Sequence, residues 1–273
     1  MKKLVMVYAA VGLLLVSVGS VIAAPVNYYL FDDSGGGWAD ADKTPPDSSD
    51  DLLCWAAAAS NILEWTGFGN VLGFTDTDQM FGYFKDNWTD KGGLMEYGWD
   101  WWFSGNYSGP VVGDTGRLTG SAQPVWSQPD VGTGGFYPEL NFDDYFHETW
   151  GSSESMSAVD QYLRSGYGTT LAVYSPLRGH AITVWGFEYD VDDPFYYTGV
   201  YVTDSDDKTN ALKYYEIKNV GLVWYLQGFY GTDYYWHIGG VQAMAPIIIP
   251  EPATITMLGI GLIALIKRKT GKK

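Results

Sequence analysis

Hydrophobic residues in the first half of the chain recur three or four positions apart, the spacing that predicts amphipathic helices. In the segment that begins at Asp50 or Asp51, Ala58, Ile62 and Trp65 share one face before glycines end the pattern. The same spacing occurs in two later segments. The sequence therefore predicts three helices, over residues 50–65, 77–87 and 155–164.

Beyond Gly166 the pattern changes to an alternation of apolar and polar residues, which is the period of a β-strand. These segments are rich in Val, Ile, Tyr, Trp and Thr, and turns that contain Gly, Asn and Asp separate them. Because the helices mostly precede the strands rather than alternate with them, we expect an α+β fold with an antiparallel sheet. Six strands are predicted, over residues 169–174, 180–189, 197–203, 212–217, 222–226 and 235–244.

Residues 1–23 have the three parts of a secretory signal peptide. Two lysines precede an apolar run over residues 4–18, and small residues follow as far as Ala23. Cleavage after Ala23 fits best, because cleavage one residue later would place Pro25 first in the mature chain. A retained N-terminal anchor is the alternative.

Residues 247–273 combine three features in a fixed order. Pro250-Glu251-Pro252-Ala253 comes first, an apolar stretch from Thr254 to Ile266 follows, and a basic cluster ends the chain. As a helix this stretch would span about 20 Å, less than the hydrocarbon core of a bilayer. The order resembles the PEP-CTERM sorting signal of bacterial envelope proteins, which implies transient membrane anchoring and recognition by an exosortase. A plain C-terminal membrane anchor is the alternative.

The 273 residues carry a formal net charge of −16 at pH 7. Such an acidic surface repels the phosphates of nucleic acids, so nucleic-acid binding is disfavoured. The body between the two ends, residues 24–246, has the length of one large domain, and an aromatic fraction of 16% supplies apolar area for its core. Glycines cluster between residues 105 and 135, which predicts a long irregular region.

Cys54 is the only cysteine, so it has no partner for an internal disulfide. At the start of a helix, the dipole and unpaired N–H groups favour the thiolate, although a small buried core residue is the alternative. His180 begins a predicted strand and Asp204 follows the next one, so this carboxylate could orient the imidazole to accept the thiol proton. Asp204, Asp206 and Asp207 could instead bind calcium, although the other EF-hand residues are absent.

Three separated motifs carry these residues: Asp50-Asp51-Leu52-Leu53-Cys54, Gly179-His180-Ala181-Ile182 and Tyr201-Val202-Thr203-Asp204-Ser205-Asp206. Together they resemble the Mac/IdeS-type papain-like cysteine peptidases, whose founding members cleave immunoglobulin G at the hinge. The resemblance covers most of residues 37–217. It implies a papain-like fold, with a helical front half whose nucleophile helix packs on an antiparallel β-sheet, and it makes residues 24–246 a peptidase domain.

The resemblance also implies roles for individual residues. Cys54 is expected to be the nucleophile, His180 the general base and then acid, and Asp204 the group that orients His180. Asp206 matches a second acid near the site, and Lys43 matches a lysine of the oxyanion hole, although one extra residue separates Lys43 from the cysteine. With one cysteine and three histidines the chain lacks the ligands of a structural zinc site, and we expect no metal or cofactor.

The resulting hypothesis is an exported cysteine endopeptidase of the bacterial cell envelope that hydrolyses extracellular proteins or peptides. The segment from residue 99 to 135 departs most from the family, so specificity for immunoglobulin is not expected to transfer. The alternative is a noncatalytic surface or matrix protein that binds polysaccharide, with Trp99, Trp101 and Trp102 stacked on sugar rings. A glycosidase has less support, because no specific spacing of carboxylates indicates one.

Overall fold

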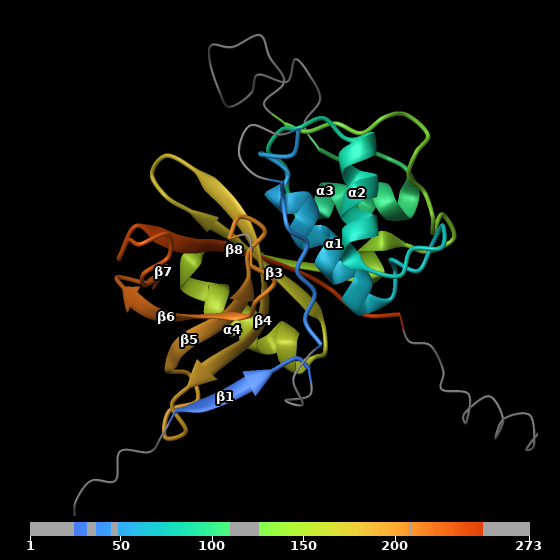
Figure 1. Cartoon of the computed structure of the whole chain (residues 1–273). Coiled ribbons are helices and arrows are strands. Elements are labelled where there is room, and N and C mark those ends of the chain that lie inside the picture. The colour runs from blue at the N-terminus through green and yellow to red at the C-terminus, as the bar shows by residue number, and fades with distance from the viewer. Residues whose placement is uncertain (1–24, 32–36, 45–48, 110–125, 208, 248–273) are drawn as a thin grey trace, which may run out of the picture.

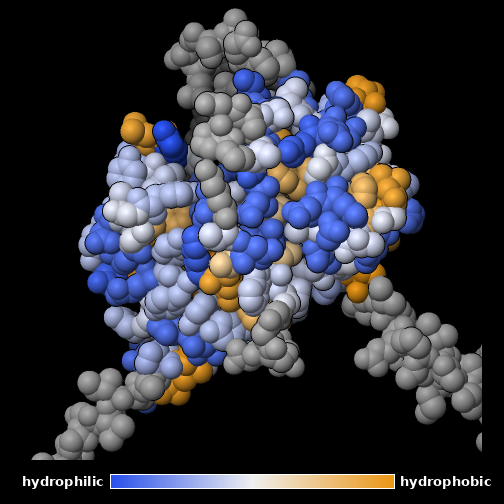
Figure 2. Space-filling model, viewed as in Figure 1, coloured by the Kyte–Doolittle hydropathy of each residue, from blue (hydrophilic) through white to orange (hydrophobic). Residues whose placement is uncertain are grey.

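The computed structural model describes residues 25–31, 37–44, 49–109, 126–207 and 209–247. The expected signal peptide and nearly all of the expected sorting tail lie outside the described residues, as does the middle of the glycine-rich region. Figure 2 shows a largely hydrophilic face on which hydrophobic residues form small separate patches.

The centre of the fold is a closed antiparallel barrel of six strands (Figure 1). The order around the barrel is β4 (Gly179–Tyr189), β3 (Gly168–Tyr174), β8 (Trp236–Met244), β7 (Val223–Leu226), β6 (Lys213–Val220) and β5 (Tyr197–Thr203). Each strand pairs with the next, and the last, β5, pairs with the first, β4. Two short strands extend this sheet, β1 (Val26–Tyr29) on β4 and β2 (Phe146–Trp150) on β8.

The expectation of a papain-like α+β fold, with the nucleophile helix packed on an antiparallel sheet, is wrong. The six predicted strands all form, with bounds close to the predicted ones, but they make a barrel rather than that arrangement. An alternating sequence predicts that a strand has two different faces, and it does not specify whether the outer strands of a sheet pair with each other. Here Thr183 of β4 pairs with Thr203 of β5, which closes the barrel.

Four α-helices are described, and three of them were predicted. The first, α1 (Cys54–Thr66), begins at the cysteine, whereas α2 (Thr77–Asn87) has its predicted bounds and α4 (Ser152–Arg164) starts three residues early. The unpredicted helix is α3 (Met95–Ser104), which contains Gly98. A Cβ atom on Gly98 would lie 2.7 Å from the Trp55 ring, so the glycine allows α1 and α3 to approach. Within the described parts of the chain, we find no helix with the length and apolar character needed to cross a membrane.

Two hydrophobic cores lie on opposite sides of β4. Helices α1, α2 and α3 form an aromatic-rich layer, to which β4 contributes Ala181 and Trp185. The second core fills the barrel and includes α4, and β4 contributes Ile182 and Val184 to it. Alternating residues of β4 thus join the helical layer to the barrel. The candidate site lies at this junction between the two layers.

Candidate functional site

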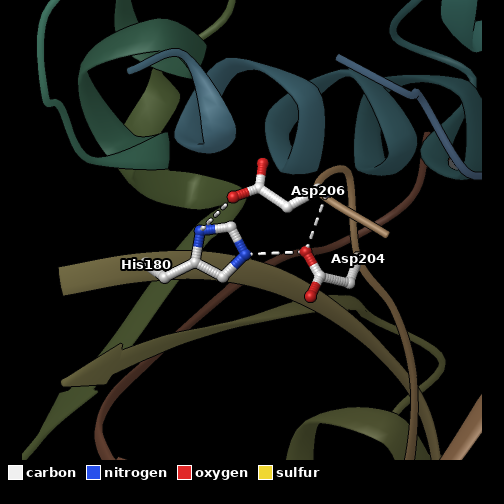
Figure 3. Close-up of side chains that lie close together, drawn as sticks. All are labelled: His180, Asp204 and Asp206. Carbon is white, nitrogen blue, oxygen red and sulfur yellow. Dashed lines mark hydrogen bonds and ion pairs between the residues drawn. The ribbon is translucent and has the colours of Figure 1, made fainter. Parts of the chain in front are cut away.

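The site lies at one end of the barrel, where β4 begins and β5 ends. His180 is the second residue of β4, and Asp204 directly follows the last residue of β5. Because Thr183 and Thr203 pair in this antiparallel ladder, both side chains reach the same end of the barrel. The Nε2 atom of His180 lies 2.7 Å from Oδ1 of Asp204, and the two residues are only 9% and 2% exposed. Figure 3 shows the imidazole ring between the carboxylates of Asp204 and Asp206.

Helix α1 places Cys54 at this end of the barrel. The helix contacts both β4 and β3, and Asn61, two turns after the cysteine, is buried between the layers. Asn61 donates from Nδ2 to Oγ1 of Thr183 at 2.9 Å. Its Oδ1 accepts from the N–H of Ala41 at 2.8 Å and from the hydroxyl of Thr77 at 2.9 Å. One side chain therefore joins α1 to β4, to α2 and to the segment 37–44.

The thiol of Cys54 and the imidazole of His180 line the same cleft and lie close enough to interact electrostatically. Burial opposes the thiolate, but the charges of His180 and Lys43 together lower the pKa of Cys54. Burial also opposes the imidazolium, but the charge of Cys54 and the hydrogen bond to Asp204 raise the pKa of His180 well above its ordinary value. The site therefore favours a thiolate beside an imidazolium, the form in which a cysteine attacks.

Asp204 accepts hydrogen bonds on both carboxylate oxygens. Besides His180, the backbone N–H of Asp206 lies 3.1 Å from Oδ1, and the hydroxyl of Tyr230 lies 3.0 Å from Oδ2. Burial opposes the charge, but the hydrogen bond with His180, the charge of that ring and these two donors lower the pKa of Asp204. An ionised carboxylate thus holds Nε2 of His180, which leaves Nδ1 as the ring atom for proton exchange with the thiol.

Tyr230 is a site residue that the sequence reasoning missed. It lies between β7 and β8 with φ of 49°, a left-handed conformation that costs a non-glycine residue about 1–3 kcal/mol. Its hydroxyl is also 3.3 Å from Nε2 of His180, and burial with the charges of Asp204 and Asp206 raises its pKa, so the phenol remains a donor. The flanking glycines 228 and 231 indicate a turn, but no sequence signal gave the direction of the ring.

Lys43 lies at the site as part of a charged group. Its Nζ is 2.6 Å from Oδ1 of Asp206 and donates to the carbonyl oxygen of Asp51 at 2.5 Å. The second oxygen of Asp206 lies 4.0 Å from Nδ1 of His180, and the backbone N–H of Lys43 donates to the carbonyl of Ser205. The structure thus brings together all the residues that the sequence selected: Lys43, Cys54, His180, Asp204 and Asp206.

These residues open onto a cleft of about 1250 Å³ between the helical layer and the barrel. That volume exceeds the roughly 300–1,000 Å³ of a pocket for a drug-sized ligand, so the cleft has room for several residues of an extended peptide. Its wall combines apolar and aromatic side chains with the polar group just described. The apolar lining residues include Leu94, Met95, Trp126, Tyr174, Leu177 and Trp236.

Two alternatives from the sequence lose their structural basis. Asp204, Asp206 and Asp207 do not form a joint calcium site. Asp204 pairs with His180 and Asp206 pairs with Lys43, whereas the carboxylate of Asp207 lies in a different group, with those of Asp40 and Asp42. The proposed sugar platform is also absent, since its three tryptophans are fully buried in the helical layer: Trp99, Trp101 and Trp102.

Comparison with known families adds one finding. The family model Mac 1 matches residues 128–227. The match supports a Mac/IdeS-type family and is consistent with a peptidase-related domain. It covers less than half of the chain, including His180, Asp204 and Asp206 but not Cys54 or Lys43. No curated protein matches the chain.

Proposed function

We propose that this protein is an exported cysteine endopeptidase that hydrolyses peptide bonds of extracellular proteins. The observation that carries the proposal is the meeting of Cys54, from the helical layer, with His180 and Asp204 from the barrel. A thiol in contact with an imidazole, which is itself oriented by a carboxylate, is the arrangement of an activated nucleophile. The match of the Mac 1 model to the part that contains His180 and Asp204 supports the same activity.

In the proposed reaction, the Cys54 thiolate attacks the carbonyl carbon of the substrate peptide and forms a tetrahedral intermediate. The imidazolium of His180 then gives its proton to the leaving amine, and the C–N bond breaks to leave a thioester on Cys54. His180 next removes a proton from a water molecule that attacks the thioester. The C–S bond then breaks and the acid product leaves. Cys54 is again a thiolate, and His180 is again an imidazolium because it keeps the proton that it took from the water.

The negative oxygen of the tetrahedral intermediate needs donors close to Cys54. The backbone N–H of Cys54 is one, because the first N–H groups of an α-helix have no partner within the helix. Lys43 is the second in our proposal. Its ion pair with Asp206 holds the ammonium at the mouth of the cleft, and its charge already lowers the pKa of the thiol.

The cleft suggests an extended polypeptide rather than a small molecule as substrate. Specificity for immunoglobulin is not part of the proposal, because the Mac 1 match does not include most of the segment from residue 99 to 135. We propose export through the N-terminal signal and surface sorting through the C-terminal tail by an exosortase. Cell fractionation with mass measurement of the surface form tests this part separately: an intracellular chain with both ends intact would contradict it.

The central test compares wild type with Cys54→Ala and His180→Asn on a panel of denatured proteins and with an epoxide inhibitor that alkylates thiols. We expect both variants to lose roughly 10⁴-fold or more in hydrolysis, because the nucleophile and its base act as a unit. His147→Asn is the matched control, since His147 stacks on Tyr167 with ring centroids 4.9 Å apart, away from the cleft lining. Hydrolysis that survives in Cys54→Ala would reject the mechanism.

A further inference from the structure

A second group of carboxylates lies next to the site and has no role in the proposed reaction. Asp40 and Asp42 come from the segment 37–44, and Asp207 comes from the turn that follows β5. One carboxylate oxygen of each lies within 4.8 Å of the others. The chain thus directs three acidic side chains from two distant segments to a single point.

The burial of Asp40 distinguishes this group from an ordinary acidic surface. Asp40 is only 4% exposed, and neither of its carboxylate oxygens has a hydrogen-bond partner. The N–H of Ala211 is near enough to favour the ionised form, but it makes no hydrogen bond of normal geometry with Asp40. Leaving a carboxylate buried without a partner is costly, so the arrangement calls for a positive ligand.

The local charges define the ligand further. Lys213 lies with its Nζ 2.7 Å from Oδ2 of Asp207, and the other oxygen of Asp207 accepts two hydrogen bonds from Thr209. When all three carboxylates are ionised, this single ammonium leaves two negative charges, which a divalent cation would balance. An all-oxygen donor set selects a hard cation rather than zinc or copper.

Calcium fits this donor set better than magnesium. Ca²⁺ binds six to eight oxygens at about 2.3–2.6 Å in flexible geometry and accepts several carboxylates, so opposite ligands lie up to about 5 Å apart. Mg²⁺ requires near-octahedral geometry at about 2.0–2.1 Å and commonly keeps several waters with one or two carboxylates. Three convergent carboxylates exceed the one or two that Mg²⁺ commonly takes, and they therefore favour the larger ion.

We propose that Asp40, Asp42 and Asp207 form a Ca²⁺ site that fastens the segment 37–44 to the turn after β5. The site adjoins the catalytic group through the chain itself, because Asp42 precedes Lys43 and Asp207 follows Asp206. Those neighbours form the 2.6 Å ion pair at the cleft. The cation thus stabilises the two segments that carry Lys43 and Asp206. Its binding does not depend on the proposed peptidase activity.

Binding can be measured on the full chain after removal of metal ions with a chelator, by calorimetric titration with CaCl₂ and by thermal unfolding. We expect saturable binding of one Ca²⁺ per chain and, at a hundredfold excess over Kd, a rise in Tm of about 5 °C or more. Asp40→Asn should abolish both responses. Asp86→Asn, an exposed position on α2, should leave both unchanged.

The same experiment separates the other outcomes. If Asp40→Asn raises Tm and wild type shows no response to Ca²⁺, the group is stabilised by protons rather than a cation, and the proposal is overturned. An equal response to MgCl₂ at the same concentration would overturn the assignment to calcium. Ca²⁺ binding with no detectable hydrolysis would support the cation site while counting against the proposed function, so the two proposals can fail separately.

Discussion

The helical layer and the barrel make different contributions to the candidate site. The helical layer, with the segment before it, provides Cys54 and Lys43, the groups expected to meet the substrate carbonyl. The barrel provides His180 and Asp204, the groups expected to move and orient a proton, and both are almost fully buried. The Mac 1 match includes only the barrel side of this division. In the proposed mechanism, activation of the nucleophile therefore depends on how precisely two separate cores are held together.

The largest expected effect on the barrel side comes from Asp204→Asn. The amide keeps the shape but removes the charge that orients His180 and raises its pKa, so we expect a loss in kcat of about 10²–10⁴-fold. Asp192→Asn, at an exposed turn between β4 and β5, is the matched control. Steady-state kinetics on a fluorogenic peptide measures both variants. A loss of less than fivefold in Asp204→Asn would mean that the barrel does not orient the base in this way.

On the helical side, Lys43→Met should lower kcat by about 10²–10³-fold, the usual effect of removing one donor to the oxyanion. KM should change much less, because the interaction strengthens only when charge develops on the substrate oxygen. Lys218→Met, which removes an exposed lysine paired with Glu216 on β6, is the control. A change in KM alone would reassign Lys43 to substrate binding.

The pH profile of kcat/KM tests how the two halves are coupled. Activity should fall at low pH as the Cys54 thiolate gains a proton, and at high pH as the His180 imidazolium loses one. Because the pKa of Cys54 is lowered and that of His180 is raised, the acidic limb should lie below the ordinary pKa of a cysteine and the alkaline limb above the ordinary pKa of a histidine. Lys43→Met should move the acidic limb upward, and Asp204→Asn should move the alkaline limb downward. A narrow optimum in wild type would show that thiol and imidazole are not coupled.

Tyr230→Phe should have the smallest effect, a loss of about threefold to tenfold in kcat. The variant removes the donor to Oδ2 of Asp204, so the carboxylate becomes easier to protonate and orients His180 less firmly. A shift in the pH profile would distinguish this positioning role from a change in packing. Tyr234→Phe is a closely matched control, because Tyr234 lies in the same loop and also has positive φ. Equal effects of the two substitutions would remove Tyr230 from the site.

Much of the local structure could be predicted because it depends on local patterns. The apolar positions of α2, including Met80, Phe81 and Phe84, gave its bounds, and the alternation in β4 and β5 placed His180 and Asp204 at strand ends. The order of three motifs then selected a group of residues that the structure does bring together.

Features that depend on long-range packing could not be predicted in the same way. Closure of the barrel requires β5 to pair with β4 as well as β6, which no local pattern encodes. The sequence of helix α3 has no recognisable polar face, and it contains Gly98, which disfavours a helix. The glycine is needed because the Trp55 ring packs directly against it, a contact that the sequence does not reveal. Tyr230 reaches the site through one left-handed residue, and Asp40 meets Asp207 only because the segment 37–44 is hydrogen-bonded to the end of β5 and the turn after it.

Asn61 has a consequence for how the nucleophile could be tuned. It lies seven residues after Cys54, which is about 10 Å along the same face of α1. Its amide is hydrogen-bonded to β4, to α2 and to the backbone of Ala41, so the middle of the helix is held in place. The sulfur of Cys54 lies about 10 Å along the helix from this point, so a small tilt of α1 about Asn61 displaces the sulfur relative to the imidazole of His180. Reactivity can therefore be adjusted by substitutions that never touch the cleft.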